Sequence, residues 1–298
     1  MTNATSVLRY PGGKSRKSIQ QLILSYAPMN YQEFRECFAG GAGVFFGVDR
    51  SKKRWINDKN TDLISFYRAL RDRHSEFIAT CRTIHAEEPG EEQIATSTGR
   101  LINKRLRDKF YDLLDDTTAD PALRYFFHNR TSFAGRVMYD PSLVKRLSYS
   151  NPSGWNIVAT DKLERAAEHL QGVTITCRDF ERVMMEPGEN VWIFGDPPYI
   201  ADTEAPRSGK LYQHSFTYAD HERLAQAVHE CPHRVCLSYD DHPLVRRLYK
   251  GMHIHEHAWL YCGSPRKRKK LGRELIITNY AVDLPYSMFS DEPLATAA

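Results

Sequence analysis

The tetrapeptide Asp196-Pro197-Pro198-Tyr199 combines an acid, two prolines and an aromatic ring directly after the apolar run at residues 191–195. Proline lacks a backbone N–H and fixes φ, so we expect the chain to leave a strand here as a rigid arch whose carbonyl groups need donors from outside the sheet. An exocyclic amino group is such a donor, and the ring of Tyr199 offers a face on which a planar base can stack. An ordinary turn after a strand is the alternative interpretation.

A second candidate site is the glycine-rich segment Phe38-Ala39-Gly40-Gly41-Ala42-Gly43, which also follows an apolar run. Glycines at this place let the backbone approach a ligand closely and aim N–H groups at an electronegative atom. The spacing is not Gly-x-Gly-x-x-Gly, so the dinucleotide fingerprint is incomplete and a tight turn without a ligand stays open. Asp58, after the next predicted strand, stands where doubly wound folds place an acid that binds ribose hydroxyls. Together these segments predict a nucleoside-type cofactor.

Two further segments could complete the cofactor site. The run Tyr10-Pro11-Gly12-Gly13-Lys14 joins a ring, a turn and a cation, which suits a ligand with a carboxylate; a phosphate loop or a plain turn would also fit this run. Asp179 could accept a hydrogen bond from the amino group of a bound adenine, with Phe180 packed against the base. A helix cap is the more common role of an acid at such a position.

The apolar periodicity predicts alternating strands and helices, which is typical of an α/β fold. Strands are expected at 31–38, 54–56, 173–177, 191–195, 234–238, 253–260 and 274–279, and helices at 19–26, 44–48, 62–73, 161–170, 220–230 and 242–250. Charged helical patterns and an aromatic, basic segment interrupt this alternation and predict an inserted domain. We expect a first catalytic part at 1–60, the inserted domain at 61–160, a second catalytic part at 161–285 and a loosely ordered tail at 286–298.

Composition sets wider limits. The chain has 298 residues, 41% of them hydrophobic, and a formal net charge of +4, which permits a polyanionic partner without requiring one. Its six cysteines form no Cys-x-x-Cys pair, which argues against a zinc ribbon, a redox motif or a disulfide scaffold. The alternating His253, His255 and His257 have no matching acids, so we expect no metal site. A leader-like N-terminus and an apolar run of about 18 residues are both missing, which predicts a cytoplasmic protein without a membrane partner.

In their order along the chain, these segments resemble the Dam-type, alpha-class (D12) DNA adenine-N6 methyltransferases. The residues that carry the resemblance are Arg9 to Lys14, Phe38 to Gly43, Asp58, Asn129 to Arg136 and Asp196 to Tyr199. The resemblance implies a Rossmann-like methyltransferase sheet with helices on both faces and an inserted, mainly helical target-recognition domain. It also implies S-adenosyl-L-methionine as cofactor, double-stranded DNA as partner and a prokaryotic or phage origin, while a monomer and a homodimer stay open. Tyr10 stands where some relatives have tryptophan.

The resemblance also assigns roles to individual residues. The expected cofactor-binding residues are Tyr10, Gly12, Lys14, Phe38, Ala39, Gly40, Gly41, Gly43, Asp58, Asp179, Phe180 and Asp196. The expected catalytic residues are Asp196, Pro197, Pro198 and Tyr199. Residues 129–139 resemble a DNA-contacting hairpin, and a basic loop late in the chain adds positive charge. The expected DNA-binding residues are Asn129, Arg130, Ser132, Arg136, Tyr139, Lys267 and Arg268.

The chemistry of adenine agrees with these assignments. The N6 amine is a poor nucleophile because its lone pair is delocalised into the ring. Hydrogen bonds from the amine to the Asp196 carboxylate and the Pro197 carbonyl would favour a pyramidal nitrogen, while Tyr199 stacks on the extruded base. No covalent enzyme intermediate is needed, so the cysteines have no role in the reaction.

We therefore expect a site-specific DNA adenine-N6 methyltransferase, either with a restriction partner or as an orphan. A cytosine-N4 methyltransferase on the same fold is the nearest rival, and Asp196 disfavours it because serine is more common there in the cytosine enzymes. A catalytically silent DNA-binding relative stays open, as does an enzyme that methylates RNA or protein.

Overall fold

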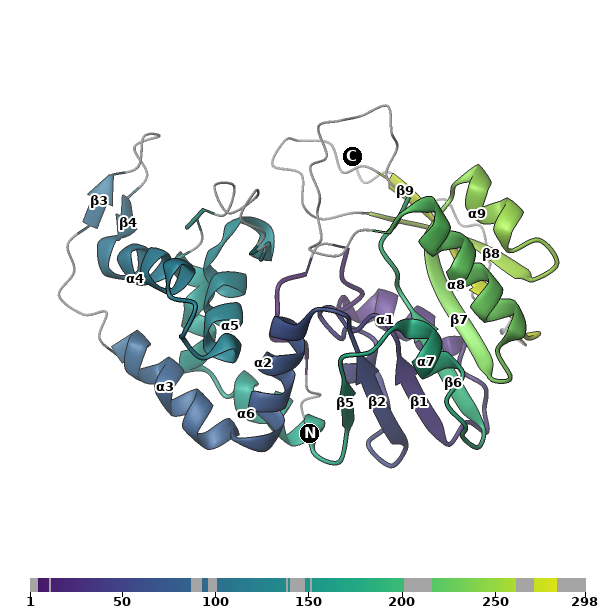
Figure 1. Ribbon diagram of the computed structural model, residues 1–298, viewed down its shortest axis with the longest axis horizontal. Helices are drawn as coiled ribbons and strands as arrows, with labels where there is room; N and C mark the ends of the chain where they lie inside the picture. The colour runs from purple at the N-terminus through teal and green to yellow at the C-terminus, as the bar shows by residue number, and fades with distance from the viewer. Residues whose placement is uncertain are drawn as a thin grey trace, which may run out of the picture.

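A computed structural model of the chain contains a seven-stranded, mostly parallel sheet with helices on both faces, beside a further group of helices (Figure 1). The structure describes residues 5–10, 12–86, 93–95, 101–137, 139, 148–150, 152–200, 216–260 and 271–282. The strand order in the sheet is β5-β2-β1-β6-β7-β9-β8. The strands are β1 (Glu33–Glu36), β2 (Lys53–Asn57), β5 (Thr174–Thr176), β6 (Val191–Gly195), β7 (Arg234–Asp240), β8 (His253–Leu260) and β9 (Leu271–Thr278).

The direction of the strands brings the candidate site segments together. Strands β5, β2, β1, β6 and β7 are parallel, so their carboxyl ends lie at one edge of the sheet. The glycine-rich segment follows β1, Asp58 follows β2 and Asp196 follows β6, with β1 hydrogen-bonded to both other strands. Ligands of open parallel sheets bind at this edge. The two remaining strands, β9 and β8, pair antiparallel on the far side of β7.

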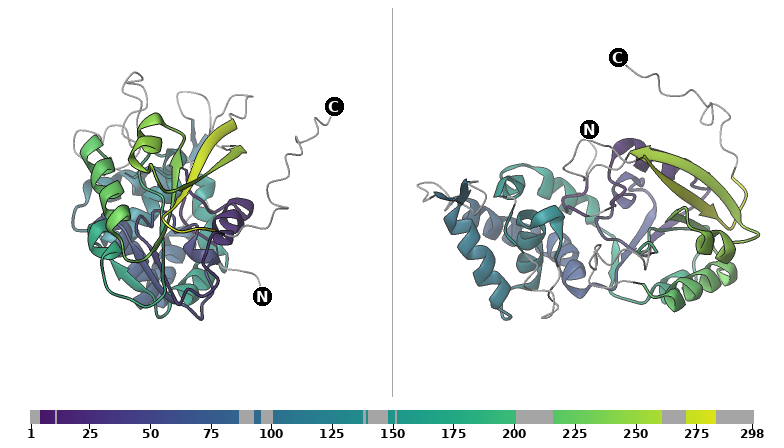
Figure 2. Two further views of the ribbon diagram at one scale, coloured as in Figure 1. Left: turned by 90° about the vertical axis from the view of Figure 1, so that its right-hand side faces the viewer. Right: turned by 90° about the horizontal axis from the view of Figure 1, so that it is seen from above.

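Helices cover both faces of the sheet and form the inserted segment. They are α1 (Lys17–Ser25), α2 (Thr61–Asp72), α3 (His74–Ala86), α4 (Lys104–Asp115), α5 (Pro121–Thr131), α6 (Lys162–Leu170), α7 (Phe180–Met184), α8 (Tyr218–Glu230) and α9 (Pro243–Leu248). Short 3-10 helices lie at η1 (Phe45–Gly47), η2 (Phe133–Gly135) and η4 (Pro152–Ala159), and β3 (Gln93–Ala95) pairs with β4 (Leu101–Asn103). Seen from above, the teal helices of the insertion and the yellow-green strands β8 and β9 occupy opposite ends of the molecule (Figure 2).

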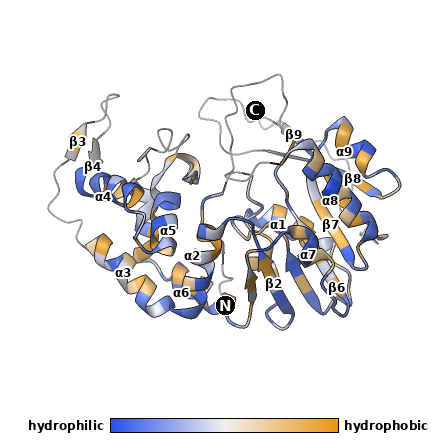
Figure 3. Ribbon diagram, viewed as in Figure 1, coloured by the Kyte–Doolittle hydropathy of each residue, from blue (hydrophilic) through white to orange (hydrophobic). Residues whose placement is uncertain are grey.

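The hydrophobic core lies on both sides of the sheet. One cluster contains Phe34 and Trp192 and continues through α2 and α5 into the insertion, and the other contains Ile193 and Val235 and lies under α7 and α8. Successive strand residues point to opposite faces, so a strand buried on both sides needs the nearly continuous apolar run that predicted β6. Helices α6 and α8 show separate polar and apolar faces (Figure 3).

The insertion shares its core with the sheet. Helix α2 contacts α5 and α6 as well as β5, and His169 of α6 packs its ring against Phe45 beyond β1. The predicted boundaries at residues 60 and 160 therefore fall beside helices that contact both parts, and they stay a prediction.

Two predicted elements differ from the structure. The expected helix at 44–48 is a single 3-10 turn, which ends where Val48 adopts an extended backbone conformation. The expected hairpin from Asn129 is wrong at its start, because Asn129 and Arg130 belong to the last turn of α5. One bridge, between Ser132 and Tyr149, is formed in this part of the described chain.

The described cysteines are free thiols, namely Cys37, Cys81, Cys177, Cys231 and Cys236. Burial raises the pKa of the Cys81 thiol to about 12, which disfavours the thiolate form needed by a nucleophile. Within the described ranges, no helix is both long and apolar enough to cross a membrane.

The buried His128 of α5 predicts acid lability. Its Nε2 lies 2.9 Å from the Phe110 carbonyl oxygen, which can only accept, so Nε2 carries the proton and Nδ1 accepts from the Tyr139 hydroxyl. Burial lowers the pKa of His128 from 6.5 to about 4. The unfolded chain therefore binds a proton first as the pH falls, and stability present above pH 6.5 is lost toward pH 4.

We expect His128→Gln to flatten this part of the pH profile. Denaturant unfolding between pH 7 and pH 4 measures the free energy of unfolding, and the variant should lose less of it than the wild type. The exposed His229 of α8 provides the control, since His229→Gln should keep the wild-type slope. Equal slopes for wild type and His128→Gln would contradict the prediction.

Candidate functional site

The carboxylate of Asp196, directly beyond β6, is held by two other segments of the chain. Its Oδ1 accepts hydrogen bonds from Ser238 Oγ at 2.6 Å and from Lys14 Nζ at 2.8 Å. Ser238 is buried in β7, and Lys14 comes from the loop before α1. Both of these donors use Oδ1, and the side chain is 21% exposed. The second oxygen, Oδ2, is thus the one left to accept a hydrogen bond from a ligand.

Lys14 joins Asp196 to a second acid. The Lys14 side chain is 4% exposed, and its ammonium donates to the Gly12 carbonyl at 3.1 Å and to the Tyr199 hydroxyl at 2.8 Å. The Tyr199 hydroxyl in turn donates to Glu274 Oε2 at 2.8 Å, and Lys14 Nζ lies 3.5 Å from the same oxygen. Glu274 belongs to β9 and its side chain is 0% exposed. The buried Lys14 ammonium compensates the charge of the buried Glu274 carboxylate, which would otherwise be costly to bury, and it also pairs with the partly exposed Asp196.

Sequence reasoning missed Ser238 and Glu274. A signal was present for both, because Ser238 interrupts the apolar run at 235–239 and Glu274 directly precedes the apolar run at 275–277. Such a residue is either exposed at a sheet edge or paired inside the protein, and the sequence does not distinguish these cases.

The geometry gives Lys14 partners that the sequence did not predict. The sequence assigns Lys14 to the cofactor, and its described hydrogen bonds go to Gly12, Asp196 and Tyr199. Lys14 is therefore part of the acid and tyrosine cluster, and its contact with a cofactor stays a prediction.

The glycine-rich loop packs closely against the first loop, the segment from Arg9 to Lys14 that precedes α1. A Cβ on Gly43 would lie 2.7 Å from the Lys14 carbonyl carbon, and one on Gly40 would lie 2.9 Å from the Tyr10 ring. Gly40 and Ala42 both have positive φ, of 45° and 51°, which only glycine adopts without strain. The Gly40 amide donates to Asp58 Oδ2 at 3.0 Å, so the acid after β2 shapes the loop after β1.

A buried acid that the sequence did not indicate supports this loop. Glu36, the last residue of β1, is 2% exposed and accepts a hydrogen bond from the Phe45 amide at 2.9 Å. Burial, together with the negative charges of Asp196 and Asp58, raises the pKa of Glu36 well above its usual range. Three acids thus lie at the carboxyl ends of β1, β2 and β6, and the raised pKa of Glu36 favours the neutral form of that carboxyl group.

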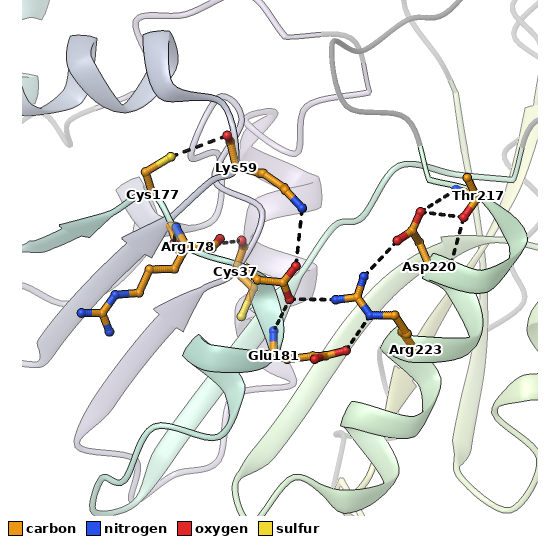
Figure 4. A network of polar contacts seen from close by, with 10 residues as sticks. Cys37, Lys59, Cys177, Arg178, Glu181, Thr217, Asp220 and Arg223 are labelled. Carbon is orange, nitrogen blue, oxygen red and sulfur yellow. Dashed lines mark hydrogen bonds and ion pairs between the residues drawn. The ribbon is translucent and has the colours of Figure 1, made fainter.

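Asp179 takes the role of a helix cap. Its carboxylate accepts from the Glu181 amide at the start of α7 and lies 3.0 Å from Arg223 Nη2 and 3.6 Å from Lys59 Nζ. Figure 4 shows Arg223 between Glu181 and Asp220, at 2.8 and 3.0 Å. These ion pairs join α7 to α8, and they hold the Asp179 carboxylate in one orientation at the sheet edge.

The ring of Phe180 belongs to an aromatic group. Its centroid lies 5.6 Å from that of Phe38, which follows β1, and 5.8 Å from that of Phe216, which precedes α8. The Phe38 and Phe216 centroids are also 5.6 Å apart. Three rings from separate segments form one apolar wall beside the glycine-rich loop, and Phe216 was not predicted.

Three of the predicted DNA contacts have hydrogen-bond partners within the protein. Asn129 is 0% exposed; its amide accepts from the Arg9 N–H and donates to the Arg9 and Gly135 carbonyls at 2.8 to 2.9 Å. The Ser132 hydroxyl is buried and donates to the Arg136 carbonyl at 2.7 Å. Arg130 donates to the carbonyls of Gly154 and Val7, and burial lowers its pKa to about 10. Asn129 and Arg130 thereby hold the loop before Lys14 in place, and the DNA-binding role of these three residues stays a prediction.

Other members of the predicted set differ in their surroundings. Tyr139 packs under Arg124, whose guanidinium carbon lies 4.0 Å from the ring centroid, and is thus part of the insertion's core. Arg136 is half-buried and lies 5.9 Å from the ring of Phe133, which is 57% exposed. The pair forms an aromatic and basic surface at the end of α5, of which the sequence analysis named only Arg136. The predicted contacts Lys267 and Arg268 lie outside the described residues.

The histidines of β8 have partners of another kind. His257 Nε2 lies 2.6 Å from the Tyr26 hydroxyl, and the rings of His255 and Tyr26 meet edge to face with centroids 5.1 Å apart. Among the described residues, no group of His, Cys, Asp and Glu is arranged to hold a metal ion.

Comparison with known proteins gives a consistent family. The family model for D12 class N6 adenine-specific DNA methyltransferases matches residues 10–262. The Type II methyltransferase M1.LlaDCHI of Lactococcus lactis is 27% identical over 286 residues, which cover 93% of this chain and 96% of that protein. The DNA adenine methylase of Serratia marcescens is 26% identical over 256 residues, which cover 81% and 85%. The DNA N-6-adenine-methyltransferase of Escherichia phage P1 is 25% identical over 248 residues, which cover 82% of this chain and 31% of that longer protein.

The contacts of Asn129 predict a large loss of stability on truncation. Asn129→Ala leaves the Arg9 N–H and two carbonyls without their partner in the interior, which should cost about 2–4 kcal/mol of unfolding free energy. Chemical denaturation measures this cost. The exposed Asn30, whose amide accepts from Arg234 at 3.2 Å, provides a control, and Asn30→Ala should cost less than about 0.5 kcal/mol. A similar small cost for both variants would show that the Asn129 contacts do not support the loop.

Proposed function

This chain belongs to the D12 class of N6 adenine-specific DNA methyltransferases, and we propose that it methylates an adenine that is extruded from double-stranded DNA and bound at Asp196. We propose S-adenosyl-L-methionine as the methyl donor. Base extrusion is required because N6 of a paired adenine cannot reach a donor at the sheet edge.

The observation that carries the proposal is the asymmetric support of the Asp196 carboxylate. Oδ1 is held by Ser238 and Lys14, at 2.6 and 2.8 Å, while neither donor uses Oδ2. A carboxylate held in this way presents one oxygen in a set direction, as is needed to accept a hydrogen bond from an amine. The next residue, Pro197, adds a carbonyl group and has no N–H of its own to satisfy it.

The surroundings of the amine fit direct transfer. Two acceptors at the N6 amine favour a pyramidal nitrogen with a localised lone pair, and the oriented carboxylate stabilises the positive charge that develops there. Tyr199 supplies a stacking surface, since one side of its ring packs on Tyr239 with centroids 6.0 Å apart. No described cysteine is activated by its surroundings, which agrees with a reaction without a covalent enzyme intermediate.

The residues beside the glycine-rich loop fit S-adenosyl-L-methionine. When bound, this cofactor supplies an electrophilic methyl group on a sulfonium. We propose that Asp58 accepts hydrogen bonds from the ribose hydroxyls of the cofactor. Phe38, Phe180 and Phe216 would pack on its adenine ring, and Asp179 would accept a hydrogen bond from the adenine amino group. The acids Asp58 and Asp196 at the sheet edge suit a cation. Because Gly43 packs directly on the backbone at Lys14, we propose that backbone groups of these two loops line the cofactor site.

Transfer to cytosine N4 is the nearest rival chemistry, because that amine is also exocyclic. The match to an adenine-specific family does not favour it. The same match argues against a protein without enzymatic activity.

Asp196→Ala is expected to abolish methylation. Without the oriented carboxylate the rate should fall by at least about 100-fold, as when a single preorganised polar group is removed from an active site. Nucleoside analysis of plasmid from a methylation-free host measures the product. Asp241→Asn is the control, since the Asp241 carboxylate pairs with Arg246 at the surface. N4-methylcytosine in place of N6-methyladenine from the wild type, or an active Asp196→Ala variant, would contradict the proposal.

We propose that Phe133 and Arg136 contact the DNA duplex. Phe133→Ala should weaken binding by about 1–3 kcal/mol through the loss of base stacking, and Arg136→Ala should reduce the salt dependence of binding if the side chain contacts phosphate. Binding is measured with labelled duplex at two salt concentrations. Tyr218, which is 54% exposed on α8, provides an aromatic control whose truncation should leave affinity unchanged. Equal effects at Phe133 and Tyr218 would refute the proposed contact.

A further inference from the structure

We propose that Glu274 is a positioning residue for the transfer reaction: it holds Lys14 and Tyr199 as one unit, so that Lys14 orients Asp196 without binding it too tightly. Glu274 touches neither of the bound molecules in this proposal and acts through its two neighbours. The inference depends on the proposed binding of the target amine at Asp196.

The antiparallel direction of β9 explains how Glu274 reaches the site. Glu274 is the first residue of β9 that pairs with β7, and its partner in register is Asp240, at the carboxyl end of β7. A parallel strand would bring its last residues to this edge, whereas an antiparallel strand brings its first residues there. The carboxylate is therefore placed beside the parallel strands' carboxyl ends, where Asp196 and Tyr199 follow β6.

The hydrogen bonds in this cluster have a determined direction. An ammonium group can only donate, so the Tyr199 oxygen accepts from Lys14 Nζ at 2.8 Å. The Tyr199 hydroxyl proton is then available for Glu274 Oε2, also at 2.8 Å. The series of hydrogen bonds from Lys14 through Tyr199 thus ends on the Glu274 carboxylate. It fixes the direction of the Tyr199 hydroxyl and therefore the position of the hydroxyl end of the ring. Packing on Tyr239 fixes the face of the ring.

The balance of charge gives Glu274 its effect on Asp196. Lys14 Nζ lies 2.8 Å from Asp196 and 3.5 Å from Glu274, and both Lys14 and Glu274 are removed from solvent. In such a low-dielectric place, two nearby carboxylates share the attraction of one cation. With Glu274 neutral, Lys14 would be paired with Asp196 alone, and Asp196 would be a weaker acceptor for the developing positive charge on the amine.

Glu274→Gln tests this role because it keeps the shape and removes the charge. We expect kcat to fall about 10- to 100-fold, the range that corresponds to losing one charge-assisted hydrogen bond. The KM for S-adenosyl-L-methionine and the dissociation constant for duplex DNA should change by less than about twofold, since Glu274 contacts neither in the proposed site. Thermal unfolding of each variant is measured in parallel to confirm that it is folded.

Tyr199→Phe removes only the hydroxyl that joins Lys14 to Glu274. Each single variant should reduce kcat, and the double variant should reduce it by less than the product of the two single effects, because both changes break the same series of hydrogen bonds. Glu256→Gln on β8 is the matched control; Glu256 pairs with Arg246 at the surface, and kcat should stay at the wild-type value.

Wild-type kcat in Glu274→Gln, or multiplicative effects of the two changes, would overturn the role of Glu274. A lower melting temperature and a higher KM for S-adenosyl-L-methionine together with the lower kcat would also overturn it, because these changes would indicate a purely structural residue. If Asp196→Ala keeps full activity, the proposed site itself fails. If Asp196→Ala is inactive and Glu274→Gln keeps the wild-type kcat, the role of Glu274 is refuted while the proposed site at Asp196 stands.

Discussion

The buried ammonium of Lys14 is the interaction on which the site depends. It lies within 3.5 Å of two carboxylates, one directly beyond β6 and one in β9, and it also donates to the hydroxyl of Tyr199. Neither carboxylate could be buried at this edge alone, because an uncompensated charge in the interior is strongly destabilising. The first loop, the end of β6 and the start of β9 must therefore come together for the site to form. Formation of the site is in this sense coupled to completion of the sheet.

Close backbone packing carries the position of Lys14 into the rest of the molecule. Gly43 allows the loop after β1 to contact the backbone at Lys14, and Asn129 of α5 binds both backbone groups of Arg9. The end of α5 therefore touches the same loop that supplies the cation. Phe133, which is exposed just beyond α5, lies four residues after Asn129. The segment with the proposed DNA contact is thus connected, through Asn129 and the loop that follows Arg9, to Lys14, which binds Asp196.

Local patterns predicted the elements of the sheet well. The predicted strands at 191–195 and 253–260 coincide with β6 and β8. For β6 the reason is that an apolar run bounded by polar or turn residues has few other stable arrangements. The prediction was wrong for the start of the expected hairpin, where α5 continues through Asn129 and Arg130. These polar residues are buried by contacts with residues about 120 positions earlier, such as Arg9, and no local pattern records such a partner.

The sequence by itself determined the family and the α/β class, and it predicted Asp196 and Tyr199 as the central pair of the site, because motif order and strand periodicity are local properties of the chain. Only the tertiary structure decided what surrounds them. The contacts of Lys14 with Asp196 and of Tyr199 with Glu274 join residues 182 and 75 positions apart. Such pairs depend on strand order and direction, and on the requirement that every buried charge has a partner. That requirement placed Lys14 between Asp196 and Glu274, and it made Asn129 a support of the loop at Arg9.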